Sequence, residues 1–278
     1  MLNARTFRNL RILILLLILL VVALNSWLSK IRTTDWQEPL WVLVYPLSGD
    51  GLPDTQTYID SLAPDTFAAI EVFFAREAAR YGAGSGIDDP VFVQLAPQVL
   101  STPPALPHNP SLFDNIRWSL SMRWWAWRND TWQGPAPDIR IFMRYYSPEN
   151  RDRLAHSLGL QKGLIGLVNA FASESQQGQN NVVAAHELLH TLGASDKYDL
   201  DTGLPLWPEG YAEPDRVPRY PQRLAEIMGG RLPISNGWAL IPPGLGEVVV
   251  GPATAREINW PDSAPLPPNA KVLAGDGI

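Results

Sequence analysis

The stretch VVAAHELLHTLGASD, Val182 to Asp196, is the most informative part of this sequence. It holds two of the four histidines of the chain, His186 and His190, and a glutamate directly follows the first. On a helix, each residue turns by about 100°, which places His190 roughly 40° and Glu187 roughly 100° from His186. The apolar side chains gather on another face, so we expect the three polar groups to share a face of their own.

These residue types at this spacing are typical of a catalytic metal site. Two neutral imidazoles one helical turn apart can reach the same Zn²⁺ ion without cancelling its charge. A glutamate beside them can take a proton from water and pass it to a leaving group. We therefore expect one zinc ion per chain, with His186 and His190 as ligands and Glu187 as the general base. The simpler interpretation is an amphipathic helix that carries two surface histidines.

A catalytic zinc site needs a third protein ligand, and three carboxylates compete for that position. Gly193 lies where a helix can end in a left-handed turn, and Asp196 follows three residues later. Glu209 and Glu213 lie further along, in the Pro-rich segment LWPEGYAEPDR. We favour Asp196 because a single turn at Gly193 would bring it back to the metal, which needs fewer assumptions. Glu209 and Glu213 remain as alternatives. The remaining histidines are expected at the surface: His108 and His156.

Together, His186, Glu187, His190, Gly193 and Asp196 read H-E-x-x-H-x-x-G-x-x-D. This pattern resembles the zinc-binding signature of the metzincins, with aspartate in place of the usual third histidine, as in snapalysin-like peptidases. The resemblance implies a zinc endopeptidase in which the two histidines and Asp196 bind zinc and Glu187 is the general base. It covers only this short segment and leaves the subfamily open.

Metzincins also have a methionine-containing turn beneath the metal, and the candidate here is LAEIMGG, which contains Met228. The two glycines after the methionine suit a tight turn. The family pattern has a tyrosine two residues after the methionine, where this chain has Gly230. The plainer interpretation of Met228 is one more core residue.

Strands and helices alternate ahead of this segment. Apolar and β-branched runs predict strands at 41–47, 90–97, 138–147 and 163–173. Amphipathic patterns predict helices at 65–81, 112–128, 182–192 and 254–260. The order fits a zincin-like α+β domain with a mixed, twisted sheet, followed by an irregular C-terminal subdomain. An edge position for the strand at 163–173 would let it pair with an extended peptide.

The predicted helix at 112–128 is apolar on two stripes. One stripe consists of Phe113, Ile116, Leu120, Trp124 and Trp127, and the other of Trp118, Met122 and Trp125. Because a layered domain covers such helices on two sides, we expect both stripes to be buried. The alternative is contact with a lipid headgroup surface, for which tryptophan with arginine is typical.

The amino terminus has a different character. LRILILLLILLVVALNSWL, residues 10–28, approaches the roughly 20 apolar residues that a helix needs to cross a bilayer. Arginines precede it, so we expect a single-pass membrane protein with residues 1–9 cytoplasmic and the catalytic domain periplasmic or extracellular. A cleaved signal peptide is the alternative. Residues 29–40 would then be a linker, 41–260 the metallopeptidase domain, and 261–278 a Pro-rich tail.

Composition excludes several other chemistries. The chain has no cysteine, so thiolate ligands and disulfides are excluded. A net charge of −6 argues against nucleic acid as a partner. The expected partners are a protein or peptide substrate and the membrane. Two alternatives share the metal site: a noncatalytic zincin-like domain that binds peptides or partners, and a zinc amidase that acts on a nonpeptide substrate.

Overall fold

A five-stranded sheet forms the centre of the fold in a computed structural model that describes residues 4–84, 88–105, 107, 111–150, 154, 157–160 and 163–262. In spatial order the strands are β2 (Val91–Leu95), β1 (Leu40–Ser48), β3 (Ile139–Tyr146), β5 (Ile165–Phe171) and β4 (Leu158–Leu160). The first four are parallel, and β4 pairs with β5 in the antiparallel sense. The expected mixed sheet of an α+β fold is therefore present.

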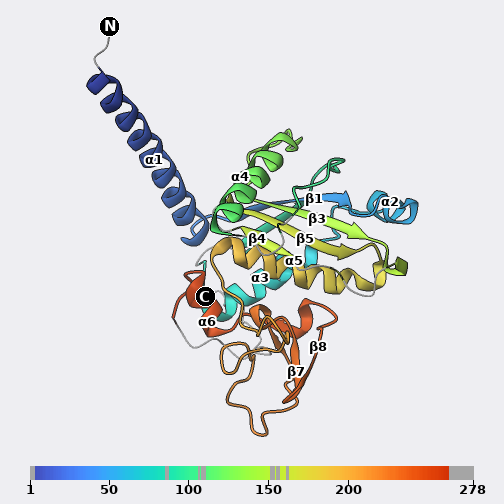
Figure 1. The fold of residues 1–278 in the computed structure, drawn as a ribbon. Coiled ribbons are helices and arrows are strands. Elements are labelled where there is room, and N and C mark those ends of the chain that lie inside the picture. Colours follow the sequence, from blue (N-terminus) through green and yellow to red (C-terminus); the bar gives the residue numbers. More distant parts are fainter. Residues whose placement is uncertain are drawn as a thin grey trace, which may run out of the picture.

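Helices cover both faces of this sheet (Figure 1). Helices α3 (Ala68–Tyr81) and α5 (Gln177–Leu192) pack on one face, and α4 (Leu112–Arg128) packs on the other. In β1, Val42 and Val44 point toward the first layer while Leu43 and Tyr45 point toward the second. Since successive side chains of a strand alternate between faces, a strand covered on both sides must be apolar almost throughout.

The predicted elements are largely confirmed, with shifted ends. Helix α3 begins at Ala68, later than expected, and ends at Gly82 in the left-handed conformation, with φ 63°. Two short elements were not predicted: α2 (Pro53–Asp60) and the strand β4. The strand at 163–173 does not have the edge position that peptide pairing would need, because β5 pairs with β3 on one side and β4 on the other. The edge strand on this side of the sheet is β4.

The two stripes of α4 have different environments. The stripe that faces the sheet is buried and consists of Trp118, Met122 and Trp125. The other stripe is 51% to 75% exposed and consists of Phe113, Ile116, Leu120, Trp124 and Trp127. The prediction that both are buried is wrong, because α4 is the outermost layer on its face of the sheet (Figure 1).

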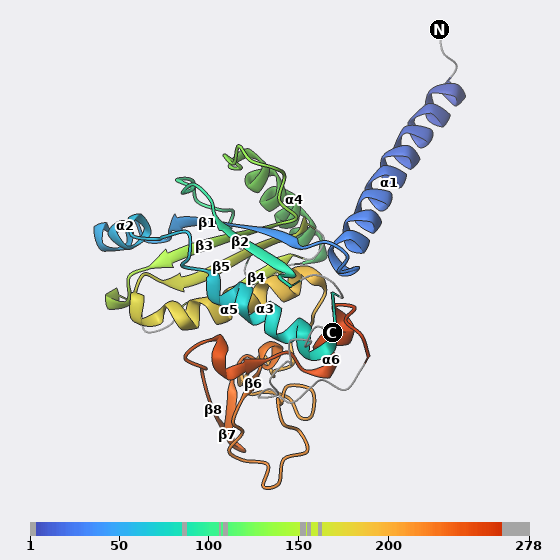
Figure 2. The same cartoon turned by 180° about the vertical axis from the view of Figure 1, so that it is seen from behind.

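Helix α1 (Ala4–Thr34) contains the segment predicted to be a membrane anchor, 10–28, and projects away from the sheet (Figures 1 and 2). Among the helices that the structure describes, none combines the length and the apolar character that a membrane span requires. The helix also runs into the predicted linker, 29–40, where Trp36 is buried. His108, His156 and residues 263–278 of the predicted tail lie outside the described residues.

The chain beyond α5 forms short elements joined by long loops, as expected for an irregular subdomain. It lies against the layer of α3 and α5 (Figure 2). Its strands are β6 (Ala225–Glu226) paired with β9 (Val248–Val249), and β7 (Leu232–Ser235) paired with β8 (Trp238–Leu240). Its helical turns are η4 (Ile227–Gly229), η5 (Leu245–Glu247) and α6 (Pro252–Glu257). The remaining 3₁₀ turns are η1 (Pro148–Asn150) and η3 (Glu174–Gln176).

Strand β4 packs so closely on α5 that only glycine fits at position 159. A side chain at Gly159 would place its Cβ 2.4 Å from the Cβ of His190 and 2.8 Å from the carbonyl oxygen of Glu187. Gly159→Ala is therefore expected to lower the free energy of unfolding by about 1–3 kcal/mol, measured by urea denaturation. Gly237→Ala is the control, since nothing lies within 4 Å of its added Cβ. Equal stability of both variants would contradict this packing.

Candidate metal centre

Helix α5 places its polar trio inside the protein. Leu188, Leu189 and Leu192 join the core between α5 and the sheet. His186 and Glu187, on a neighbouring face, are only 8% and 5% exposed: Ile227 of the C-terminal subdomain lies beside His186, and Gly159 of β4 lies beside Glu187. The interpretation of two surface histidines is therefore wrong for His186, while His190 is half-buried. Buried polar groups are costly unless they have partners, so their contacts indicate what the site is for.

Backbone carbonyls orient both imidazoles. The Nδ1 atom of His186 lies 2.9 Å from the carbonyl oxygen of Ile227, and that of His190 lies 2.8 Å from the carbonyl oxygen of Ala194. A carbonyl oxygen only accepts, so each Nδ1 carries the proton and donates. Each Nε2 donates to Asp196 when it carries a proton and can bind a cation with its lone pair when it does not, as in metal-binding histidines whose other ring nitrogen donates to a carbonyl.

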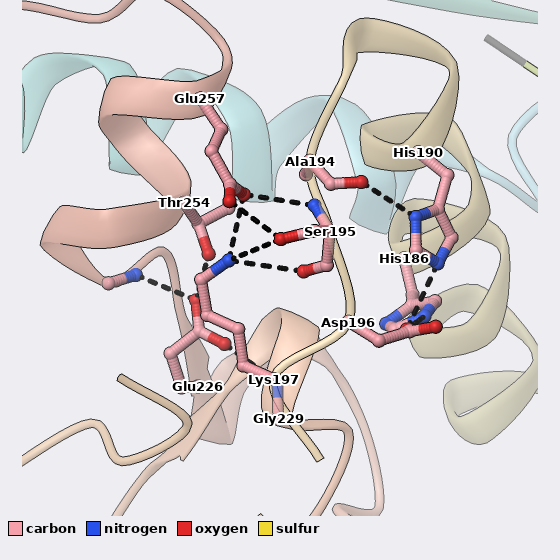
Figure 3. Close-up of polar contacts among 11 residues, drawn as sticks. His186, His190, Ala194, Ser195, Asp196, Lys197, Glu226, Gly229, Thr254 and Glu257 are labelled. Atoms are coloured by element: carbon pink, nitrogen blue, oxygen red, sulfur yellow. Dashed lines mark hydrogen bonds and ion pairs between the residues drawn. The ribbon is translucent and has the colours of Figure 1, made fainter. Parts of the chain in front are cut away.

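Asp196 faces the Nε2 atoms of both histidines. Its Oδ1 atom lies 3.1 Å from each of them (Figure 3). Gly193 makes this approach feasible: it ends α5 in a left-handed conformation with φ 110°, and Ala194 then bonds back to the carbonyl of Leu189 at 3.0 Å. Donor atoms about 2.1 Å from one tetrahedral zinc ion lie roughly 3.4 Å from each other, so the observed separations of 3.1 Å are close to those around a single ion.

Glu187 adds a carboxylate to this group. The ligand atoms of His186, Glu187 and His190 all lie within 4.8 Å of one another, so this cluster could hold a metal ion. The Oε2 atom of Glu187 is buried and has no hydrogen-bond partner among the described residues. An orphaned carboxylate oxygen beside two imidazoles fits a site that takes up a cation and a water molecule.

The charges of the site are strongly coupled. Burial alone would lower the pKa of His186, but the hydrogen bond to Asp196 and the charge of Glu187 raise this pKa to about 9. Burial also acts to raise the pKa of Asp196, yet the two imidazoles hold that pKa far below its ordinary value. The pKa of Glu187 is raised, chiefly by burial. The carboxylates of Glu187 and Asp196 thus favour a positive charge at the imidazoles, and a bound metal ion would also supply such a charge.

The methionine-containing turn lies beneath His186. Met228 is fully buried in η4, and the carbonyl of its neighbour Ile227 is the one that orients His186. Its own carbonyl accepts a hydrogen bond of 2.9 Å from the backbone N–H of Lys197. The turn ends at Gly230 in the left-handed conformation, with φ 70°. Met228 is therefore a core residue, and the turn that contains it contacts His186 through Ile227.

Tyr198, a phenol that the sequence offers as an oxyanion donor without any spacing argument, lies beside the site. Its ring centroid lies 6.2 Å from that of His186, and burial and the charge of Asp196 raise the pKa of its phenol. The ring also lies 3.8 Å from where a side chain on Gly230 would begin, the position at which the metzincin pattern has a tyrosine. The spacing from Asp196 could have indicated this position. In an extended segment, side chains two residues apart point to the same side, so the side chain of Tyr198 points to the same side as that of Asp196.

Other candidate residues lie elsewhere. Glu213 interacts with Arg216 and Arg223 at 3.6 and 3.5 Å, and Glu209 is exposed. The group of ligand atoms within 4.8 Å of one another contains His186, Glu187 and His190, and neither glutamate belongs to it. Asp196 is not part of that group either, but its Oδ1 atom lies 3.1 Å from both Nε2 atoms. Tyr211, the other phenol that the sequence offers as an oxyanion donor, directs its hydroxyl to that of Tyr220 at 2.8 Å.

Comparison with known proteins identifies no family. No protein-family model matches the chain, and no curated protein matches it. Among solved structures, the chain is similar to catalytically inactive OgpA from Akkermansia muciniphila, in complex with an O-glycopeptide (glycodrosocin) substrate. The identity is 12% and the TM-score 0.36, over 85% of this chain and 64% of that chain. The chain thus spans less than two thirds of the length of that protein.

Metal binding provides the second prediction. The purified protein is expected to bind one zinc ion, measured by elemental analysis and by competition with a chromophoric chelator. Asp196→Ala is expected to weaken binding by more than the roughly 10–100-fold that loss of an outer-shell partner costs. Glu209→Ala and Glu213→Ala are the matched controls and should bind as the wild type does. Full affinity in Asp196→Ala, with loss in either control, would contradict this ligand set.

Proposed function

We propose that this protein is a zinc-dependent metallopeptidase. Its ligands would be His186, His190 and Asp196, with Glu187 beside them as general base. The observation that carries the proposal is the convergence of both Nε2 atoms on Asp196 Oδ1 at 3.1 Å, next to a buried, unpartnered oxygen of Glu187. When bound at such a site, zinc polarises a carbonyl group and lowers the pKa of water to about 7.

Glu187 would move the proton. Its carboxylate accepts a proton from the attacking water and later delivers it to the nitrogen of the leaving amine. The raised pKa of Glu187 suits this exchange, because a carboxyl whose pKa lies nearer neutrality both accepts and donates more readily. The Oε2 atom of Glu187 is a buried acceptor without a hydrogen-bond partner among the described residues, so it is unsatisfied until a water or a substrate donates to it.

The edge of the sheet supports a peptide as the substrate. Of the described strands, β4 lies at the edge nearest the site, with one side paired to β5. Its Gly159 packs against the backbone of α5 beside Glu187 and His190. An extended peptide that paired with the other side of β4 would run past these residues, held by main-chain hydrogen bonds.

Tyr198 would donate a hydrogen bond to the oxygen of the carbonyl under attack. Burial and the nearby carboxylates raise the pKa of its phenol to about 12, so the hydroxyl keeps its proton at neutral pH. A donor aimed at an oxygen that gains negative charge stabilises the transition state more than the bound substrate.

Glu187→Gln tests the function. The substitution keeps the size of the side chain and removes its ability to accept a proton, so cleavage of a mixed fluorogenic peptide library should fall by at least about 10²-fold. Zinc content should stay at one per chain. The control is Glu209→Gln, which is expected to cleave as the wild type does.

The outcomes separate the alternatives. A zinc-loaded wild type that binds peptides without cleaving any of them would contradict catalysis and favour a noncatalytic binding domain. A protein that leaves peptides intact but hydrolyses nonpeptide amides in a Glu187-dependent manner would point to an amidase. Peptide cleavage that survives Glu187→Gln at full rate would contradict the assigned base.

Tyr198→Phe provides a further prediction. Loss of the phenol hydroxyl should lower kcat by about 10²-fold, the scale seen when one oxyanion donor is removed, with little change in KM. Tyr211→Phe is the matched control, because its hydroxyl contacts Tyr220. Steady-state kinetics on one cleaved peptide measures both. A rise in KM with an unchanged kcat in Tyr198→Phe would argue against a role in the transition state.

A further inference from the structure

The carboxylate of Glu257 accepts hydrogen bonds from both residues next to Asp196, Ser195 and Lys197. Glu257 lies on α6 and accepts hydrogen bonds from the backbone N–H of Ser195 at 2.9 Å and from its hydroxyl at 2.6 Å. It also accepts one from the ammonium group of Lys197 at 2.7 Å (Figure 3). Three bonds from the residues on either side of Asp196 therefore meet at a single side chain some sixty residues away.

The cation in this cluster is buried. Lys197 is 3% exposed, and besides Glu257 its ammonium group reaches the carbonyl oxygen of Ser195 at 3.1 Å. Burial would raise the pKa of the Glu257 carboxyl, yet the bonds from Lys197 and Ser195 bring that pKa below its ordinary value. A buried lysine is costly without an anionic partner, so this ion pair strongly constrains where residues 195–197 can lie.

The same small helix is also tied to the methionine-containing turn. Glu226 is fully buried and accepts bonds from Gly251 N–H at 3.0 Å and from the Thr254 hydroxyl at 2.6 Å, at the start of α6. Its other oxygen accepts a bond of 2.7 Å from Gly229 N–H in the turn. Helix α6 thus connects the turn beneath His186 to the loop that carries Asp196.

We infer that Glu257, through Ser195 and Lys197, is a positioning residue that holds Asp196 in place to bind the metal. Asp196 follows the left-handed turn at Gly193, and its carboxylate is 33% exposed, so the helix alone does not fix it. Fixing the residues on both sides reduces the freedom that the loop would lose when the metal binds. The inference rests on the proposed metal centre, and Glu257 itself does not touch the ligand atoms.

Zinc affinity tests this role without relying on activity. Glu257→Ala is expected to weaken zinc binding by about 10–100-fold in competition with a chromophoric chelator, the range for outer-shell partners of metal ligands. The matched control is Arg256→Ala on the same helix, whose side chain is 53% exposed and should leave affinity unchanged. Glu257→Gln keeps the volume and one accepting oxygen but removes the second acceptor and the negative charge that pairs with Lys197, so an intermediate loss is expected.

A double-substitution cycle separates positioning from general destabilisation. If Ser195 and Glu257 act through their shared bonds, Ser195→Ala adds little further loss of zinc affinity in the Glu257→Ala background. The Co²⁺-substituted Glu257→Ala protein should also show a changed visible absorption spectrum, because the ligand geometry is altered. Losses that multiply in the double variant, with an unchanged Co²⁺ spectrum, would overturn the inference.

Different results would contradict the metal centre and the positioning role of Glu257. A wild-type protein that binds no zinc would contradict the metal centre. Wild-type zinc binding with full affinity retained in Glu257→Ala would contradict only the positioning role.

Discussion

The site depends on two hydrogen bonds that fix the direction of its imidazoles. Carbonyl oxygens of Ile227 and Ala194 hold the Nδ1 atoms of His186 and His190, so both Nε2 atoms point to one position. Without these bonds a buried imidazole could adopt either tautomer, and the two lone pairs would not have to converge. One carbonyl comes from the turn at the methionine and the other from the chain just after α5, so both depend on the C-terminal subdomain.

This dependence gives the irregular subdomain its role. Its short strands and turns could not form a stable layer alone, since they bury few apolar side chains. They are held against α3 and α5 by a core that includes Ile227, Met228 and Leu245. The buried carboxylate of Glu226 and the pair of Glu257 with Lys197 then join its distant segments. The sheet and α5 provide a rigid base, and the subdomain completes the donor set around it.

The sequence predicts the central fold well because its signals are local. The apolar strands, the helical face with the two histidines and the glycine after α5 each carry a periodic or steric signal within a few residues. The closeness of Asp196 to the histidines also follows, since only a short turn separates them. Strand β4 was missed because three residues are too few to show a period. The exposed stripe on α4 was misjudged because composition does not reveal which layer is outermost.

The long-range contacts could not be predicted in this way. Nothing in a single sequence links Glu257 to Ser195, or Ile227 to His186, because such pairs are set by how the subdomain folds back. Tyr198 combines both kinds of contact. Its spacing from Asp196 can be seen in the sequence, but its position next to Gly230 cannot. Functional side chains supplied by loops are therefore harder to identify than those on a helix, even when the two groups lie in contact.

The most direct test is a crystal structure of the zinc-loaded protein with diffraction data collected on both sides of the zinc absorption edge. The account predicts one anomalous peak per chain, about 2.0–2.2 Å from His186 Nε2, His190 Nε2 and an oxygen of Asp196. Glu187 should lie beside the peak without being one of its protein ligands. A peak whose third protein ligand is Glu209 or Glu213, or no peak between the two histidines, would contradict it.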